Sequence, residues 1–210
     1  TPTSYDCTFG PVIDALVSRF GVDYNDKLLG DYFTLASIGY DRDSIAGKLG
    51  IDRDRLESTV RPLEVIYALA DHTRTLTFAI ADGALPSNTG GGHNLRVVLR
   101  RILSMLERLR WKIGLEEVAD MHIDYLKPMY PELSEQRESV RTILNIESKR
   151  YGDSLERMKG ILKKLPRRLT NDELVRLYES DGITPDLLRE HGIDVDSRDF
   201  YTRLAERHIT

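Results

Sequence analysis

Apolar side chains recur along this chain at intervals of three, four and seven residues, and this spacing constrains the fold more than any other feature. One clear example consists of Leu95, Val98, Leu99, Ile102, Leu106 and Leu109. Such spacing places apolar groups on one face of an α-helix, and no strand-like alternation of useful length is found elsewhere. We therefore predict an all-α fold, an irregular multi-helix bundle in two packed helical halves.

Glycine, proline and capping residues divide the chain into predicted helices. After an extended lead-in, the first helix begins at Pro11; the fourth begins at Asp52 and is kinked or restarted at Pro62; the fifth opens near His93 or Asn94. A long helix covers 133–165. The predicted helices end at Gly21, Gly39, Leu49, Ala84, Gly114, Leu126, Leu165, Gly182, Gly192 and His208. Pro131 is the predicted hinge, which gives halves 1–130 and 131–210.

The segment 71–101 reads DHTRTLTFAIADGALPSNTGGGHNLRVVLRR and combines an apolar helix, a Pro-Ser-Asn turn, three glycines and an arginine-rich helix. Consecutive glycines cost ordering entropy and add nothing to a core. Their backbone N–H groups at a helix start, Gly91 and Gly92 among them, can meet a phosphate. No GK[ST] sequence follows and no strand precedes, which excludes a P-loop or a dinucleotide-binding turn.

Charge is unevenly distributed along the chain, whose net charge is −4. Residues 96–112 contain six basic side chains and one acid, and residues 157–168 contain six basic side chains and no acid. The surrounding stretches are acidic, so the pattern indicates a local positive surface on an acidic body. Two ordinary solvated helix faces are the alternative interpretation.

Several function classes are excluded by composition. The single cysteine, Cys7, excludes an internal disulfide and a thiolate zinc site, and the five histidines show neither HxxxH nor HExxH spacing. No serine lies in a GxSxG motif. No transmembrane span or signal peptide is recognisable, and we predict a cytoplasmic protein.

RNA binding explains the segment 71–101 best. Asn88 stands in the turn beside the glycines, and Arg96 and Arg100 follow four residues apart on one helical face. An amide can read a base edge, arginines hold phosphates, and A-form RNA admits such a loop only in its shallow minor groove. A helical protein-interaction module and a phosphate-binding enzyme that uses the glycine run remain alternatives.

At this point the residues match a known family. The segments ADHTR (70–74) and IADGALPSN (80–88), followed by Gly92 and the pair Arg100 and Arg101, resemble alanyl-tRNA synthetase of the archaeal type. Downstream, SLER (154–157) and RLYESDG (176–182) match as well, and so does the opening TPTSYD. The resemblance covers essentially the whole chain.

The resemblance implies the helical region that reads the acceptor stem of tRNA for alanine at a G·U wobble pair. Carried over to this sequence, Asn88 and Glu179 face that pair from its two grooves. Many members have Asp where this chain has Glu179, so Asp181 is the alternative acidic reader. The remaining predicted tRNA-binding residues are Arg96, Arg100, Arg101, Gly91 and Gly92.

The resemblance also implies what lies elsewhere in the full enzyme. A class II catalytic domain, with ATP and magnesium, would precede this segment, and an editing domain with zinc would follow it. We expect no catalytic residue, metal or cofactor in these 210 residues. The expected partners are the tRNA acceptor stem and those two domains, with no DNA and no membrane.

Overall fold

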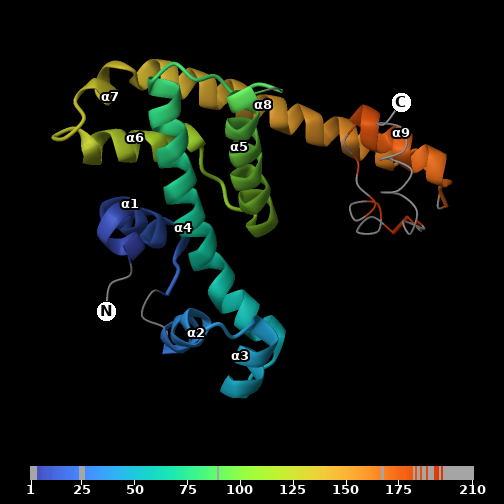
Figure 1. Ribbon diagram of the computed structural model, residues 1–210, viewed down its shortest axis with the longest axis horizontal. Helices are drawn as coiled ribbons and strands as arrows, with labels where there is room; N and C mark the ends of the chain where they lie inside the picture. Colours follow the sequence, from blue (N-terminus) through green and yellow to red (C-terminus); the bar gives the residue numbers. More distant parts are fainter. Residues whose placement is uncertain are drawn as a thin grey trace. The chain divides into compact units, whose positions relative to one another are not determined.

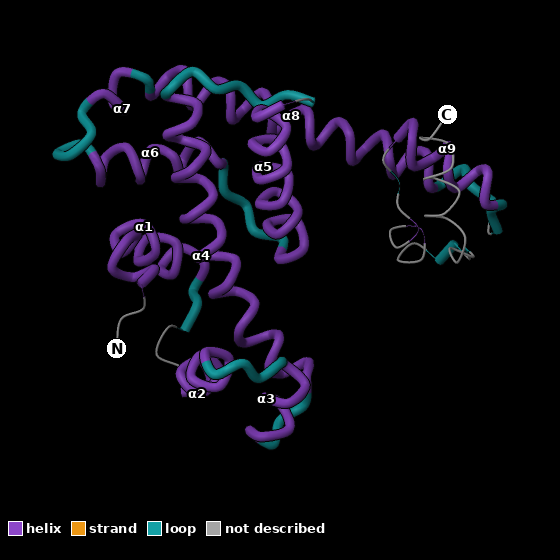
Figure 2. The backbone as a smooth tube through the Cα atoms, in the orientation of Figure 1, coloured by secondary structure: helices purple, strands orange, loops and turns teal. Residues whose placement is uncertain are grey.

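The computed structural model of the chain consists of α-helices, as predicted (Figures 1 and 2). It describes residues 4–23, 27–88, 90–166 and 168–181 and positions 183, 185, 188, 192, 193 and 195, and these contain no β-strand. The helices are α1 (Ser4–Phe20), α2 (Lys27–Ser37), α3 (Arg42–Leu49), α4 (Arg53–Ala81), α5 (Gly90–Leu109), α6 (Leu115–Leu126), α7 (Glu132–Glu135), α8 (Arg137–Leu162) and α9 (Asn171–Asp181).

The chain forms two compact units, Thr1–Lys149 and Arg150–Thr210, and the division falls within α8. Each unit has its own hydrophobic core. We predicted two helical halves, 1–130 with the Pro-Ser-Asn turn and 131–210 with the LYES motif. This division stays a prediction.

Helix α4 organises the first unit. It packs against α1, α2, α3, α5, α6 and α7. Figure 1 shows α2 and α3 near its start and α7 near its end. Its buried apolar side chains include Leu56, Ile66, Leu69 and Leu76, each fully out of solvent. Burial of each such side chain stabilises the fold by about 1.5–3 kcal/mol, so α4 is the centre of the core.

Three predicted helix starts are confirmed by their caps. The backbone N–H of Ser44 donates to Asp41 Oδ1 over 2.8 Å, and that of Arg55 donates to Asp52 Oδ1 over 2.7 Å. At the start of α9, the backbone N–H of Thr170 donates to the carboxylate of Glu173 over 2.9 Å. These side chains satisfy N–H groups that the first helical turn leaves unpaired.

The helix start predicted at Pro11 was wrong, and so was a restart of the fourth helix at Pro62. Helix α1 begins at Ser4, so Pro11 lies inside it, and α4 runs without interruption through Pro62. A proline inside a helix costs about 3 kcal/mol. Burial offsets this cost in α4, where Val60 and Leu63 flank the proline in the core. In α1 the first turns are held by the ring of Tyr5, which stacks on Tyr67 at 5.0 Å.

Several other boundaries also differ from prediction, among them the end of α5, which lies at Leu109 and not at Gly114. Helix α5 begins at Gly90, three residues before His93. The helix expected over 133–165 is divided into α7 and α8 at Gln136. Leu133 of α7 is buried in a small cluster with Ile123 and Leu126. The helices predicted to end at Gly192 and His208 lie largely or wholly outside the described residues.

The second unit has a smaller core, centred on α9. Leu174 and Val175 of α9 are fully buried, and they pack with Leu162, Leu169, Ile183, Leu188, Ile193 and Val195. Throughout the described part of the chain, every helix is too short or too polar to cross a membrane.

Candidate functional site

The Pro-Ser-Asn turn connects α4 to α5. Helix α4 stops at Ala81, and Gly83 follows with a φ of 89°, a conformation that favours glycine. Pro86 is buried, whereas Asn88 is exposed. The backbone N–H of Ser87 donates to the carbonyl oxygen of Gly92 over 2.9 Å. The turn is thus closed onto the first turn of α5, with Asn88 on its outer side.

Gly92 is required by this closure, and Gly91 is not. A Cβ atom at Gly92 would lie 2.3 Å from the carbonyl oxygen of Leu85 and 2.4 Å from Ser87 Oγ, far inside contact distance. At Gly91 a Cβ would meet nothing within 4 Å. The glycine run therefore contains one residue that fixes the turn and one whose exposed backbone is free to approach a ligand.

Arg96 holds the turn in place from α5. One of its terminal nitrogens donates to Asn88 Oδ1, and the other donates to the carbonyl oxygen of Pro86 over 3.1 Å. Its guanidinium also forms a two-nitrogen ion pair with the carboxylate of Glu147 in α8, at 3.0 and 3.1 Å. Arg96 was predicted to bind tRNA, and that prediction is untested. In this structure the Arg96 guanidinium connects Asn88 in the turn to Glu147 in α8.

Glu147 is a site residue that the sequence prediction missed. It is 6% exposed, and its partner Arg96 has a side chain that is 15% exposed. Buried carboxylates need partners. A signal was present, because Glu147 continues the stripe formed by Val140 and Leu144, where helical spacing predicts an apolar residue. An acid at a stripe position indicates a buried ion pair.

Arg100 and Arg101 follow Arg96 on α5, and both are exposed. Among the described residues neither has an ion-pair partner, although nearby arginines such as Arg42 are paired with glutamates. Unpaired guanidinium groups are available for phosphate oxygens. Their position on the helix that follows the turn fits the role predicted for them, which stays a prediction.

Glu179 and Asp181 lie on α9, but their side chains lie outside the described part of the structure. The structure gives the helix that carries them and its capped start at Thr170 and Glu173. Whether either carboxylate faces the base pair that Asn88 was predicted to read stays a prediction.

The turn can both accept and donate hydrogen bonds. Arginine is a donor only, so its bond to Oδ1 fixes which way the Asn88 amide points. The oxygen keeps one lone pair, and the two N–H groups of the amide remain free to donate. Within the described residues, no cluster of three or more His, Cys, Asp or Glu side chains could hold a metal ion. The site is suited to recognition of a polar edge.

Comparison with known proteins assigns the family. Residues 60–210 match the sequence model of the family described as tRNA synthetases class II (A). The chain is 47% identical to an alanine–tRNA ligase of Cenarchaeum symbiosum, with 99% of the chain and 25% of that protein aligned. It is 38% identical to an alanine–tRNA ligase of Thermococcus kodakarensis, with 98% of the chain and 25% of that protein aligned.

The chain spans about a quarter of the length of the curated relatives that it matches. Family membership rests on the model match, which covers more than two thirds of the chain, from residue 60 to residue 210. The chain therefore belongs to the class II (A) tRNA synthetases, and its resemblance to archaeal alanyl-tRNA synthetase is confirmed.

Proposed function

We propose that this chain is the tRNA-recognition region of an alanine–tRNA ligase, and that it reads the G·U pair in the acceptor stem of tRNA(Ala). Its relatives are named alanine–tRNA ligase, which supports the enzyme and tRNA as the partner. The hydrogen bond from Arg96 to Asn88 Oδ1 is the observation that supports the site, because it orients an exposed amide in advance. Activation of alanine with ATP belongs to a catalytic domain outside these residues.

The remaining lone pair of Asn88 Oδ1 suits the guanine of a wobble pair. In a G·C pair the guanine 2-amino group bonds to cytosine, but in a G·U pair it is left free in the minor groove. The minor groove of A-form RNA is wide and shallow, so a turn can approach it. Asn88 accepts a hydrogen bond from that amino group, while Arg100 holds the backbone.

The test is binding of the chain to acceptor-stem hairpins that carry G·U, G·C or inosine·U, measured by fluorescence anisotropy at two salt concentrations. Inosine lacks the 2-amino group. Asn88→Ala should lower affinity for G·U by about 1–3 kcal/mol, the range for one base contact, and leave inosine·U unchanged. Asn88→Asp keeps both an acceptor and a partner for Arg96, and should retain most of the preference.

Asn145→Ala is the matched control, since Asn145 is an exposed asparagine on α8. It should bind all three hairpins as the unchanged chain does. Equal losses for G·U and G·C in Asn88→Ala would show that Asn88 is not the reader. Binding that is insensitive to salt would contradict phosphate anchoring by the arginines.

A further inference from the structure

A cavity on the first unit lies between α4 and α5, away from the Pro-Ser-Asn turn. It has a volume of about 430 Å³. Tyr5 of α1 and Arg42 of α3 complete its walls. Arg101 lies eleven residues after Gly90, so the cavity is about 16 Å along α5 from the turn. A volume in this range suits a small ligand or a single nucleotide unit, and excludes a duplex.

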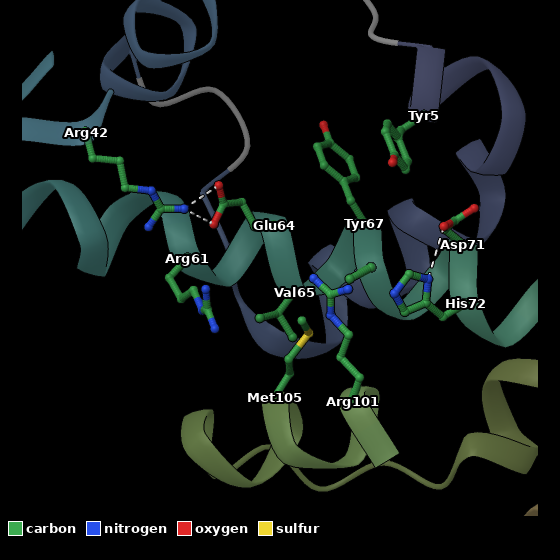
Figure 3. Close-up of a pocket in the computed structure, with 11 residues that line it drawn as sticks. Tyr5, Arg42, Arg61, Glu64, Val65, Tyr67, Asp71, His72, Arg101 and Met105 are labelled. Atoms are coloured by element: carbon green, nitrogen blue, oxygen red, sulfur yellow. Dashed lines mark hydrogen bonds and ion pairs between the residues drawn. The ribbon is translucent and has the colours of Figure 1, made fainter. Parts of the chain in front are cut away.

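Two arginines face this cavity without a carboxylate. Figure 3 shows Arg61 extending from α4 and Arg101 from α5 into the same space, and neither has an ion pair with another described residue. Like charges on facing walls repel each other, and an anion between them relieves the repulsion. The cavity therefore favours a phosphate.

The two acids of the cavity are already engaged. The carboxylate of Glu64 accepts from the guanidinium of Arg42 at 2.6 and 2.7 Å. Asp71 pairs with the ring of His72, whose Nδ1 lies 3.1 Å from Asp71 Oδ2. Both pairs are drawn in Figure 3. Three arginines (Arg42, Arg61 and Arg101) and two carboxylates line the cavity, so its lining carries a net positive charge.

An aromatic side chain lies at the rim of the same cavity. Tyr5 stacks on Tyr67 with 5.0 Å between the ring centres, and Tyr5 is 39% exposed whereas Tyr67 is 8% exposed. One face of the Tyr5 ring is thus covered, and the residue still presents a large accessible surface. Proteins that bind single-stranded RNA stack unpaired bases on such rings and hold the backbone with arginines.

We propose that this cavity binds one unpaired nucleotide of an RNA strand, with its phosphate between Arg61 and Arg101 and its base against Tyr5. The proposal rests on the proposed function in taking the bound tRNA as the source of the strand. A base inside a duplex is already stacked, so only a single-stranded portion can enter.

The experiment compares three probes: a blunt acceptor-stem hairpin, the same hairpin with a four-nucleotide single-stranded 3′ extension, and the extension as a free tetranucleotide. The extension should raise the affinity of the chain about tenfold, within the range for one stacked base. Arg61→Gln should remove most of that gain and lower the salt slope by about 0.7, the value for one phosphate contact on a single strand. Affinity for the blunt hairpin should stay unchanged.

Matched variants separate the cavity from general effects. Arg55→Gln removes an exposed arginine of α4 that does not line the cavity, and should leave the gain intact. Tyr5→Leu should lower the gain, whereas Tyr40→Leu, at a tyrosine of equal exposure elsewhere, should not. Arg61→Lys should preserve the salt slope, which a variant that had lost its fold would not do.

The outcomes distinguish the two proposals. Equal affinity for blunt and extended hairpins, with a G·U preference intact, would overturn the cavity assignment alone. Tetranucleotide binding that depends on Arg61, without hairpin binding, would support the cavity and overturn the proposed function. Displacement of the tetranucleotide by poly-glutamate at the same charge concentration would overturn the assignment to a nucleotide, and would indicate an acidic protein segment as the occupant.

Discussion

Arg96 and Glu147, which are 51 positions apart in the sequence, form an ion pair at 3.0 Å from which solvent is almost excluded. The same guanidinium donates to Asn88. The orientation of the predicted base reader thus depends on a carboxylate from another helix, which acts through Arg96.

Glu147→Gln should destabilise the first unit by about 3 kcal/mol, because removal of one partner leaves the Arg96 charge buried and uncompensated. Urea denaturation followed by circular dichroism measures the change. Glu138→Gln is the control, an exposed glutamate on the same helix. An unchanged midpoint for Glu147→Gln would mean that the pair contributes no net stability.

Gly92→Ala should destabilise the chain by about 1–3 kcal/mol, because its Cβ would collide with the backbone at Leu85. Gly91→Ala meets open space in a helical conformation and should be neutral or slightly stabilising. Thermal melts of both variants provide the comparison. Similar melting temperatures for the two would show that the turn tolerates an opening at Gly92.

His122 should make the first unit sensitive to mild acid. Burial lowers the pKa of His122 to about 4, from an ordinary value near 6.5. The folded state therefore keeps the ring neutral, and its stability is complete above pH 6.5. As the pH falls below 6.5 the unfolded chain takes up the proton first, so stability should fall by about 2 kcal/mol between pH 7 and pH 5.

Urea titrations at pH 7 and pH 5 measure this loss. His122→Leu, which cannot titrate, should show a much smaller difference over the same interval, where most carboxylates are still ionised. A loss of equal size in the variant would assign the acid sensitivity to other groups.

Arg42 should contribute to the docking of α3 on α4. Its side chain is 26% exposed and pairs with Glu57 and Glu64. The Arg42 guanidinium also lowers the pKa of Glu57. Arg42→Met should cost about 1–2 kcal/mol, reduced from a fully buried pair by solvent screening. Arg53→Met, which removes exposed pairs with Asp43 and Glu57 but leaves Glu64 paired with Arg42, should lower the urea midpoint much less.

The sequence was sufficient to predict features that depend only on residues close together along the chain, such as helix caps. Asp41, Asp52 and Thr170 cap the helices for which they were predicted, because a cap needs only the next three residues. The helix start at Pro11 and the helix restart at Pro62 were predicted incorrectly. There the distant core decides, and burial outweighs the local cost of a proline.

The same distinction holds for the candidate site. The segment that carries Asn88 and the glycines was recognisable, since its turn residues and spacing are local. The partner of Arg96 and the cavity that Arg61 and Arg101 both line depend on which helices pack together. No spacing along the sequence gives that arrangement, although the acid at the stripe position of Glu147 pointed to a hidden partner.

Helix α4 packs against six other helices and supplies one wall of the nucleotide cavity as well as the end from which the Pro-Ser-Asn turn departs. Six helices lose packing once α4 unravels, so a local opening that exposes the middle of α4 would disrupt most of the first unit. The amide protons along the middle of α4 should therefore exchange with deuterium only at the rate set by global unfolding. Unfolding of α4 would therefore remove the Pro-Ser-Asn turn, the cavity and the hydrophobic core of the first unit together.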